Sequence, residues 1–194
     1  NLYLMQYKDQ LILTGAINDV GAPVMVNVPD SYRAGIELMA HINILQNLSL
    51  DLNTTLSRNK IKSFTEYIDN WDDWSQIAVE HTNSNIAFSP SVIAGANCTW
   101  KPVKPLEISW ISKYVSKQYL DNTQSEDRIL HAYLDNKLIL ALNFSTKKLK
   151  NIQLSAQINN LFNAEYETNA WVYRYWYEGS YATLDGYFPQ AKRH

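Results

Sequence analysis

Six aromatic side chains gather between residues 171 and 181, and they are the first candidates for a binding function. Tyrosine and tryptophan rings offer a ligand a broad contact area at a small cost in conformational entropy. The same rings could instead pack against neighbouring loops. The segment reads as a connection between two strands, so we single out the three rings furthest from both strands as candidate ligand-binding residues. The six rings are Trp171, Tyr173, Tyr175, Trp176, Tyr177 and Tyr181, and the three candidates are Tyr175, Trp176 and Tyr177.

A second cluster interleaves four carboxylates with two tryptophans between residues 66 and 74. Carboxylate oxygens can hold a calcium ion. This spacing matches no calcium-binding loop, however, so a solvated acidic loop is the simpler interpretation, and calcium stays an alternative. The residues are Glu66, Asp69, Trp71, Asp72, Asp73 and Trp74.

Covalent catalysis has little support in the sequence. The four histidines are scattered without the spacing of metal ligands. No serine or aspartate lies in a nucleophile-elbow pattern. The sequence therefore predicts no enzyme active site, and no metal or cofactor site.

Composition excludes several other classes of protein. Lys and Arg number 17 and Asp and Glu 19 in 194 residues, so no basic excess indicates a nucleic-acid partner. Cys98 is the sole cysteine, which excludes an intrachain disulfide. No apolar run approaches the roughly 18 residues of a membrane helix. A transmembrane β-barrel stays possible, because its strands only alternate between apolar and polar residues.

The elements that would position both clusters are strands. The segment from Ile152 to Asn159 alternates without a slip between apolar and polar side chains, which is the period of a strand with one apolar face. Similar patterns predict strands over residues 2–13, 32–45, 48–67, 91–100, 106–119 and 129–144, with a last strand beginning near Tyr187.

The connections between these strands alternate between long and short. The long ones are residues 14–30, 68–85, 120–127 and 171–185, and the short ones are 46–47, 101–105 and 146–151. In an up-and-down antiparallel sheet this order places all long loops at one end and all tight turns at the other, as in a transmembrane barrel. Sandwiches with Greek-key connections mix the two ends.

The end of the Ile152 segment resembles a known family. Asn159-Asn160-Leu161-Phe162-Asn163, followed by Tyr166, is similar to the signature of the penultimate barrel strand in TonB-dependent outer-membrane receptors. Further stretches resemble the Bacteroidetes type of these receptors in order and spacing: residues 7–21, 29–37, 56–61, 88–90, 112–123 and 181–191. The family usually has Gly where Lys192 stands here.

This resemblance implies an all-β fold, an antiparallel up-and-down meander of about seven to eight strands. Residues 1–194 would form the last third of a 22-stranded transmembrane barrel, without the plug domain and the earlier strands. Residues 138, 140, 142, 144, 152, 154, 156 and 158 would then face lipid. The ends of the ring-rich segment would lie in the aromatic girdle at the membrane interface.

The resemblance also implies a function and a set of partners. The intact protein would be an outer-membrane receptor for TonB-energised uptake of a scarce, large ligand, such as a ferric chelate, cobalamin or a glycan. Its partners would be outer-membrane lipid, its own plug domain and remaining barrel strands, the TonB complex and the small-molecule ligand. Two alternatives remain: a soluble β-sheet module of the carbohydrate-binding or adhesin kind, and a passive porin-like channel.

Overall fold

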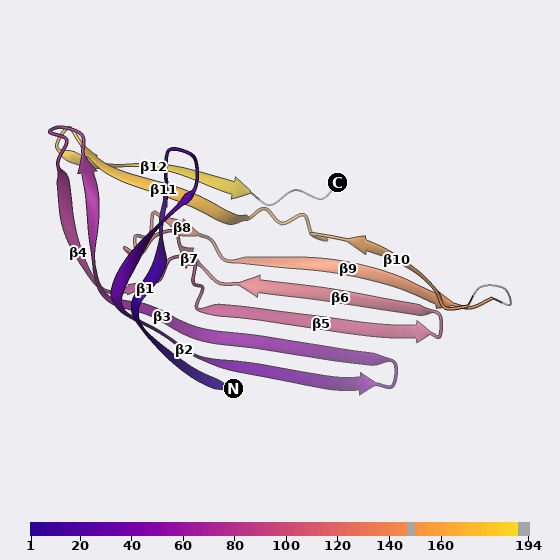
Figure 1. Cartoon of the computed structure of the whole chain (residues 1–194). Coiled ribbons are helices and arrows are strands. Elements are labelled where there is room, and N and C mark those ends of the chain that lie inside the picture. The colour runs from indigo at the N-terminus through magenta and orange to yellow at the C-terminus, as the bar shows by residue number, and fades with distance from the viewer. Residues whose placement is uncertain (147–149, 190–194) are drawn as a thin grey trace.

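The computed structural model describes residues 1–146 and 150–189, which form twelve β-strands and no helix (Figure 1). No helix in this part of the chain could therefore span a membrane. The strands are β1 (Leu2–Ile17), β2 (Pro23–Leu45), β3 (Leu48–Asn70), β4 (Gln76–Asn85), β5 (Val92–Val103), β6 (Leu106–Val115), β7 (Gln118–Tyr119), β8 (Ile129–Leu130), β9 (Tyr133–Phe144), β10 (Ile152–Ile158), β11 (Glu167–Tyr177) and β12 (Ser180–Pro189).

The main sheet is an open antiparallel meander in the order β1-β2-β3-β5-β6-β9-β10. β5 pairs with residues 48–56 of β3, and β4 pairs with residues 60–69 of the same strand. β4 and β5 are therefore two segments of one interrupted strand. β10 and β11 are likewise two segments that run in the same direction, because both run parallel to β3. With the two-residue strands β7 and β8 set aside, the described residues make eight long passes. The predicted all-β fold class and antiparallel meander are confirmed.

The register between strands collects apolar side chains on one face of the sheet. Leu154 lies opposite Leu142 and Ile158 opposite Leu138, as the alternation predicted. The same face continues from Leu138 on β9 through Trp110 on β6 to Cys98 on β5. Its large side chains are not covered by the chain: Leu154 is 56% exposed and Leu38 is 57% exposed. A broad apolar surface thus crosses the whole meander.

Three of the long connections are not loops but extensions of the strands. Only residues 18–22 separate β1 from β2, 71–75 separate β3 from β4, and 178–179 separate β11 from β12. The predicted loops over 14–30, 68–85 and 171–185 are therefore wrong in extent. Pro29, which favoured a loop, lies opposite Asp9, whose φ of 51° marks an irregularity where proline is tolerated. Dense Tyr and Trp favoured a binding loop, yet both are strong strand formers.

Smaller boundaries also differ from the prediction. The turn predicted over 101–105 shrinks to residues 104–105, since β5 runs to Val103. The strands predicted over 106–119 and 129–144 are each divided, giving the short pair β7 and β8. Most of the predicted basic turn, residues 147–149, and the end of the predicted last strand, residues 190–194, lie outside the described residues.

The buried core lies where the extensions pack on one another, away from the exposed apolar surface. One cluster contains Ile12, Val28, Ile61 and Ile86, with Phe64 against it. A second contains Leu120, Leu130, Ala170 and Val172, with Phe88 against it. The second cluster holds β11 over the loop that joins β6 to β9.

The Asn-rich signature forms the break between β10 and β11. Asn160 has a φ of 45°, and its side chain both accepts from the Ala164 amide (2.8 Å) and donates to the Ala164 carbonyl (3.0 Å). The Leu161 amide donates to the backbone carbonyl of Asn136 on β9. Tyr166 then stacks on Tyr133 with ring centroids 4.2 Å apart. The signature thus builds a compact turn that is fixed to β9 and separates β10 from β11.

Replacing Asn160 separates the two roles of this residue. In Asn160→Ala the left-handed conformation costs about 1–2 kcal/mol and each of the two lost hydrogen bonds about 0.5–1.5 kcal/mol, so we expect a loss of about 2–5 kcal/mol in the free energy of unfolding. Asn160→Gly should cost about 1 kcal/mol less, because glycine adopts this conformation freely. A denaturant titration measures both, and equal losses would show that the backbone conformation contributes nothing.

Candidate functional site

Two hairpins that are about a hundred residues apart in sequence meet at one end of the molecule. Their facing parts, residues 66–81 of the β3–β4 hairpin and 171–181 of the β11–β12 hairpin, are called the crest here (Figure 1, upper left). The Trp71 amide donates to the carbonyl of Trp176 at 2.9 Å. Tyr175 pairs in parallel with Asp69. The two candidate clusters of the sequence are therefore one structural unit.

Aromatic rings form the contact between the two hairpins. The rings of Trp71 and Tyr175 stack with centroids 4.1 Å apart and an angle of 20°. Tyr173 continues the stack, 5.9 Å from Tyr175, and its hydroxyl accepts a hydrogen bond from the Trp71 indole at 3.4 Å. On the other face of β11, Trp176 meets Tyr181 edge to face at 4.8 Å. Such pairs add about 0.5–1.5 kcal/mol each beyond buried area.

The carboxylates of the acidic cluster also join the hairpins. Asp69 accepts from Gln76 (2.9 Å) and from the Tyr173 hydroxyl (2.7 Å). Asp72 accepts from the amides of Glu178 and Gly179 at the tip of the other hairpin. No three His, Cys, Asp or Glu side chains of the described residues are grouped to hold a metal ion. The calcium alternative gains no support from this arrangement.

The hydrogen bonds of Asp69 change its acidity. The bond from Gln76, followed by the bond from Tyr173, lowers the pKa of the Asp69 carboxyl, while burial raises the pKa of the Tyr173 phenol. A pKa that is lower in the folded chain than in the unfolded chain contributes stability above the unfolded value. The Asp69 contribution is therefore complete at neutral pH and is lost as the pH falls through the depressed pKa.

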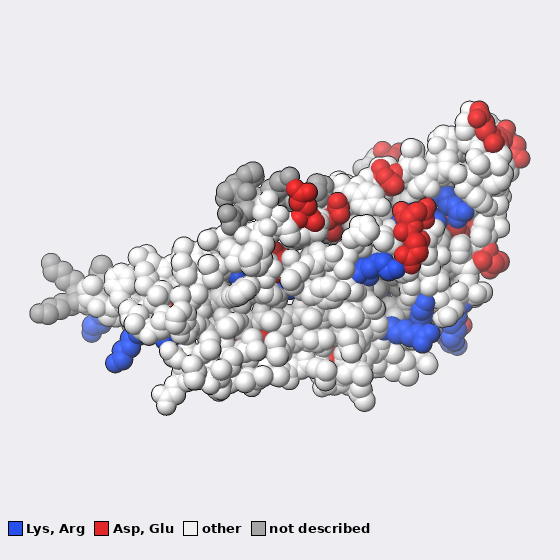
Figure 2. Space-filling model, turned by 180° about the vertical axis from the view of Figure 1, so that it is seen from behind, with Lys and Arg blue, Asp and Glu red and all other residues white. Residues whose placement is uncertain are grey.

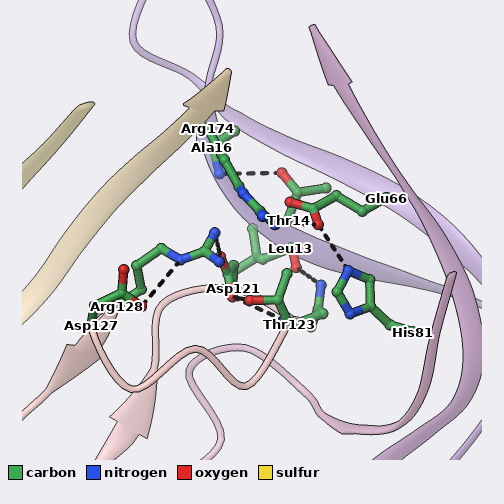
Figure 3. Close-up of polar contacts among 11 residues, drawn as sticks. Leu13, Thr14, Ala16, Glu66, His81, Asp121, Thr123, Asp127, Arg128 and Arg174 are labelled. Atoms are coloured by element: carbon green, nitrogen blue, oxygen red, sulfur yellow. Dashed lines mark hydrogen bonds and ion pairs between the residues drawn. The ribbon is translucent and has the colours of Figure 1, made fainter. Parts of the chain in front are cut away.

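A chain of polar contacts joins β3, β4 and β11 near the rings (Figure 3). One oxygen of Glu66 contacts both the Arg174 guanidinium (3.1 Å) and His81 Nε2 (2.8 Å). The guanidinium also lies 3.9 Å from the centre of the Tyr181 ring. Because Glu66 and Arg174 are less than one-fifth exposed, their pairing is screened less than an ordinary surface ion pair. Arg174 is thus held between a carboxylate and a ring.

A cavity of about 390 Å³ separates the crest from the loop between β6 and β9. That loop contributes a buried ion pair between Arg128 and Asp121, whose side chains are 5% and 6% exposed. Next to it, Asn122 donates to the Leu13 carbonyl and accepts from the Ala87 amide. This polar network ties the loop to β1 and fixes the floor of the cavity.

The three candidate residues are placed differently from their prediction. Tyr175, Trp176 and Tyr177 are the last residues of β11 rather than the middle of a loop. Tyr175 and Trp176 are half-buried by ring contacts, and Tyr177 is 46% exposed. Sequence spacing gave no means of pairing them with Trp71 and Asp69, because the two hairpins are distant along the chain. The interleaving of tryptophan with acid in residues 66–74 was the signal available.

The ion pair between Glu66 and Arg174 should hold the two hairpins together. We expect a double-mutant cycle with Glu66→Gln and Arg174→Met to give a coupling energy of about 1 kcal/mol, the upper end for exposed pairs. Hydrogen exchange of the Trp71 amide, which donates across the contact, would report it. Lys117→Met, which removes an ion pair with Glu126 in another loop, is the control. A coupling near zero would assign the docking to the rings alone.

Known proteins resemble the chain in structure rather than in sequence. No family model matches it, and no curated protein matches it. The siderophore receptor PiuA from Acinetobacter baumannii superposes on 97% of the chain with a TM-score of 0.62 and 19% identity. The ferric-catecholate import receptor Fiu from Escherichia coli K12 covers 99% of the chain with a TM-score of 0.60 and 13% identity. The ferric yersiniabactin uptake receptor FyuA from Yersinia pestis covers 95% of the chain with a TM-score of 0.57 and 17% identity.

The chain matches only part of each of these proteins. It spans 25% of PiuA, 23% of Fiu and 24% of FyuA. At these identities the likeness concerns the fold alone. The chain has the fold of a barrel segment from TonB-dependent receptors.

Proposed function

We propose that the chain is the C-terminal part of the barrel of an outer-membrane receptor, and that the intact receptor takes up a ferric chelate with energy from the TonB complex. The fold likeness to receptors named for siderophores and ferric chelates supports this proposal. The short stretches that resemble the Bacteroidetes type of receptor favour that branch of the family. The receptor would bind and move its ligand without changing it covalently, so no enzyme activity is expected.

The observation that carries the proposal is the uncovered apolar face of the sheet. It spans the meander from Leu2 on β1 to Ile158 on β10, and large side chains along it are more than one-third exposed. Soluble monomers rarely expose contiguous apolar patches beyond a few hundred Å². Lipid would cover this face. The opposite face carries the pair His41–Asp51, with 2.6 Å between its charged atoms, and suits a watery lumen.

The remaining partners follow from the open sheet. β1 and β10 lie at its two edges, and unpaired backbone groups cost several kcal/mol each in lipid. The missing barrel strands would pair with the edges, and a plug domain would fill the lumen. The crest would lie on the external side, where Tyr175, Trp176 and Tyr177 remain our proposed ligand contacts, with Tyr177 the most accessible.

Uptake of iron tests the function directly. Cells that express the intact receptor should accumulate radioactive iron supplied as a chelate, and a protonophore that abolishes the TonB energy supply should stop accumulation but not surface binding. Energy-independent accumulation would instead establish the passive channel. A protein recovered in the soluble fraction without detergent would establish the soluble module.

Leu154 and Ser155 test which face meets lipid. They are neighbours on β10 and point to opposite faces. We expect Leu154→Arg to cost about 2–4 kcal/mol if it lies near the midplane of the bilayer. Ser155→Arg places the same charge toward the lumen and should cost far less. Folding titrations of the intact receptor in lipid measure both, and equal costs would contradict the assignment of the faces.

A further inference from the structure

A second, open cavity lies on the outer side of the crest. Its volume is about 620 Å³, and its walls include Trp71, Trp74 and Tyr173 together with the polar side chains of Asp69, Asn70 and Gln76. It adjoins the cavity described above, with which it shares Asp69, Gln76 and Tyr173. A cavity of this size and lining suits a ligand that presents flat surfaces and hydrogen-bonding groups.

Trp74 is the unusual residue of this cavity. Its side chain is 86% exposed, and its backbone φ of 63° is rare for a bulky residue. The turn that carries it is fixed internally: the Asn70 amide donates to the Ser75 carbonyl, and the Ser75 amide donates to Asp73. The turn thus holds a large ring out in water, with most of its surface free for contact. Exposed tryptophans in defined positions are frequent anchors of binding.

The charges around the cavity have one sign. Asp69 lines the cavity, while Asp72, Asp73 and Glu178 lie on the two hairpin tips beside it. Arg174 of the crest is already paired with Glu66. Hydrogen bonds from the Ser75 side chain and amide lower the pKa of Asp73, as the bonds described above lower the pKa of Asp69. Both are therefore anionic at neutral pH. Figure 2 shows acidic side chains at this extreme end of the molecule (upper right).

We propose that this cavity is a ligand site that selects electroneutral or positively charged ferric chelates and rejects strongly anionic ones. The inference rests on the proposed function. A cleft lined by one sign of charge concentrates ligands of opposite sign and repels like charge. Three hydroxamates, each carrying one negative charge, leave ferric iron neutral. Three doubly deprotonated catecholates leave it with three negative charges, which the four carboxylates would oppose.

Three probes of graded charge test this selection on cells that carry the intact receptor. They are ferrioxamine B, a trihydroxamate with an extra ammonium group, neutral ferrichrome, and ferric enterobactin, a triscatecholate. We expect the affinity to fall in that order, with ferric enterobactin at least about tenfold weaker than ferrichrome, or about 1.4 kcal/mol. Added salt should weaken the binding of ferrioxamine B and leave the binding of ferrichrome nearly unchanged, because salt screens only the charged ligand.

Two variants connect the selection to the cavity. Trp74→Ser should weaken the binding of ferrichrome at least about tenfold at unchanged receptor abundance. Asp73→Asn combined with Glu178→Gln should reduce the difference in affinity between ferrioxamine B and ferric enterobactin. Glu107→Gln, which removes a carboxylate near the turn at the opposite end of the sheet, is the control and should leave that difference unchanged.

The outcomes separate this inference from the function on which it rests. If ferric enterobactin binds as tightly as the hydroxamates, or if Trp74→Ser binds like the wild type, the inference is wrong and ferric-chelate uptake stands. If the receptor reaches the surface and none of the three probes binds, the proposed uptake of ferric chelates is itself wrong, and the inference falls with it.

Discussion

The register between neighbouring strands is the constraint on which the rest of the structure depends. A strand has a side-chain period of two, so a slip of one residue would turn its whole apolar set to the polar face. Leu142 illustrates the consequence, because it meets Leu106 on one side and Leu154 on the other. The apolar surface exists because the ladders keep this phase up to the irregularities beside the turns, between Asn43 and Leu45 and between Trp100 and Val103. The tight turn at Gln46–Asn47 helps to set it for β2 and β3.

The phase is kept in the near half of the sheet, which contains residues 48–56 of β3 and their partners on β5. It is interrupted in the far half, which contains residues 60–69 of β3 and their partners on β4. β3 exchanges its partner from β5 to β4 between Leu56 and Lys60, and the Asn160 turn separates β10 from β11. These breaks let the far segments leave the plane of the sheet and pack on one another. The buried clusters around Ile61 and Leu120 are found there. One half of the molecule thus leaves its apolar face exposed, and the other half has its own core.

The sequence predicted the near half well and the far half poorly, for a physical reason. Strict alternation around Leu154 reports a strand that is apolar on one face only, whatever lies next to it. The far strands carry no such alternation, because Asp69 and Tyr173 are positioned by each other rather than by a core or lipid. Their contact joins segments about a hundred residues apart, and no local pattern encodes it. The resemblance around Asn160 marked a family signature but did not predict that the strand is broken there.

The division of the molecule also explains why the crest can combine rings with acids. Rings such as Trp71 and Tyr175 bury each other's faces, so the hairpins dock without a hydrophobic core at their tips. The acids then fulfil a second role, since Asp72 closes the contact by accepting from backbone amides that have no partner strand. A carboxylate accepts such bonds more strongly than a neutral group does. Docking and negative charge therefore have the same origin, because the carboxylates that join the two hairpins also make the crest acidic.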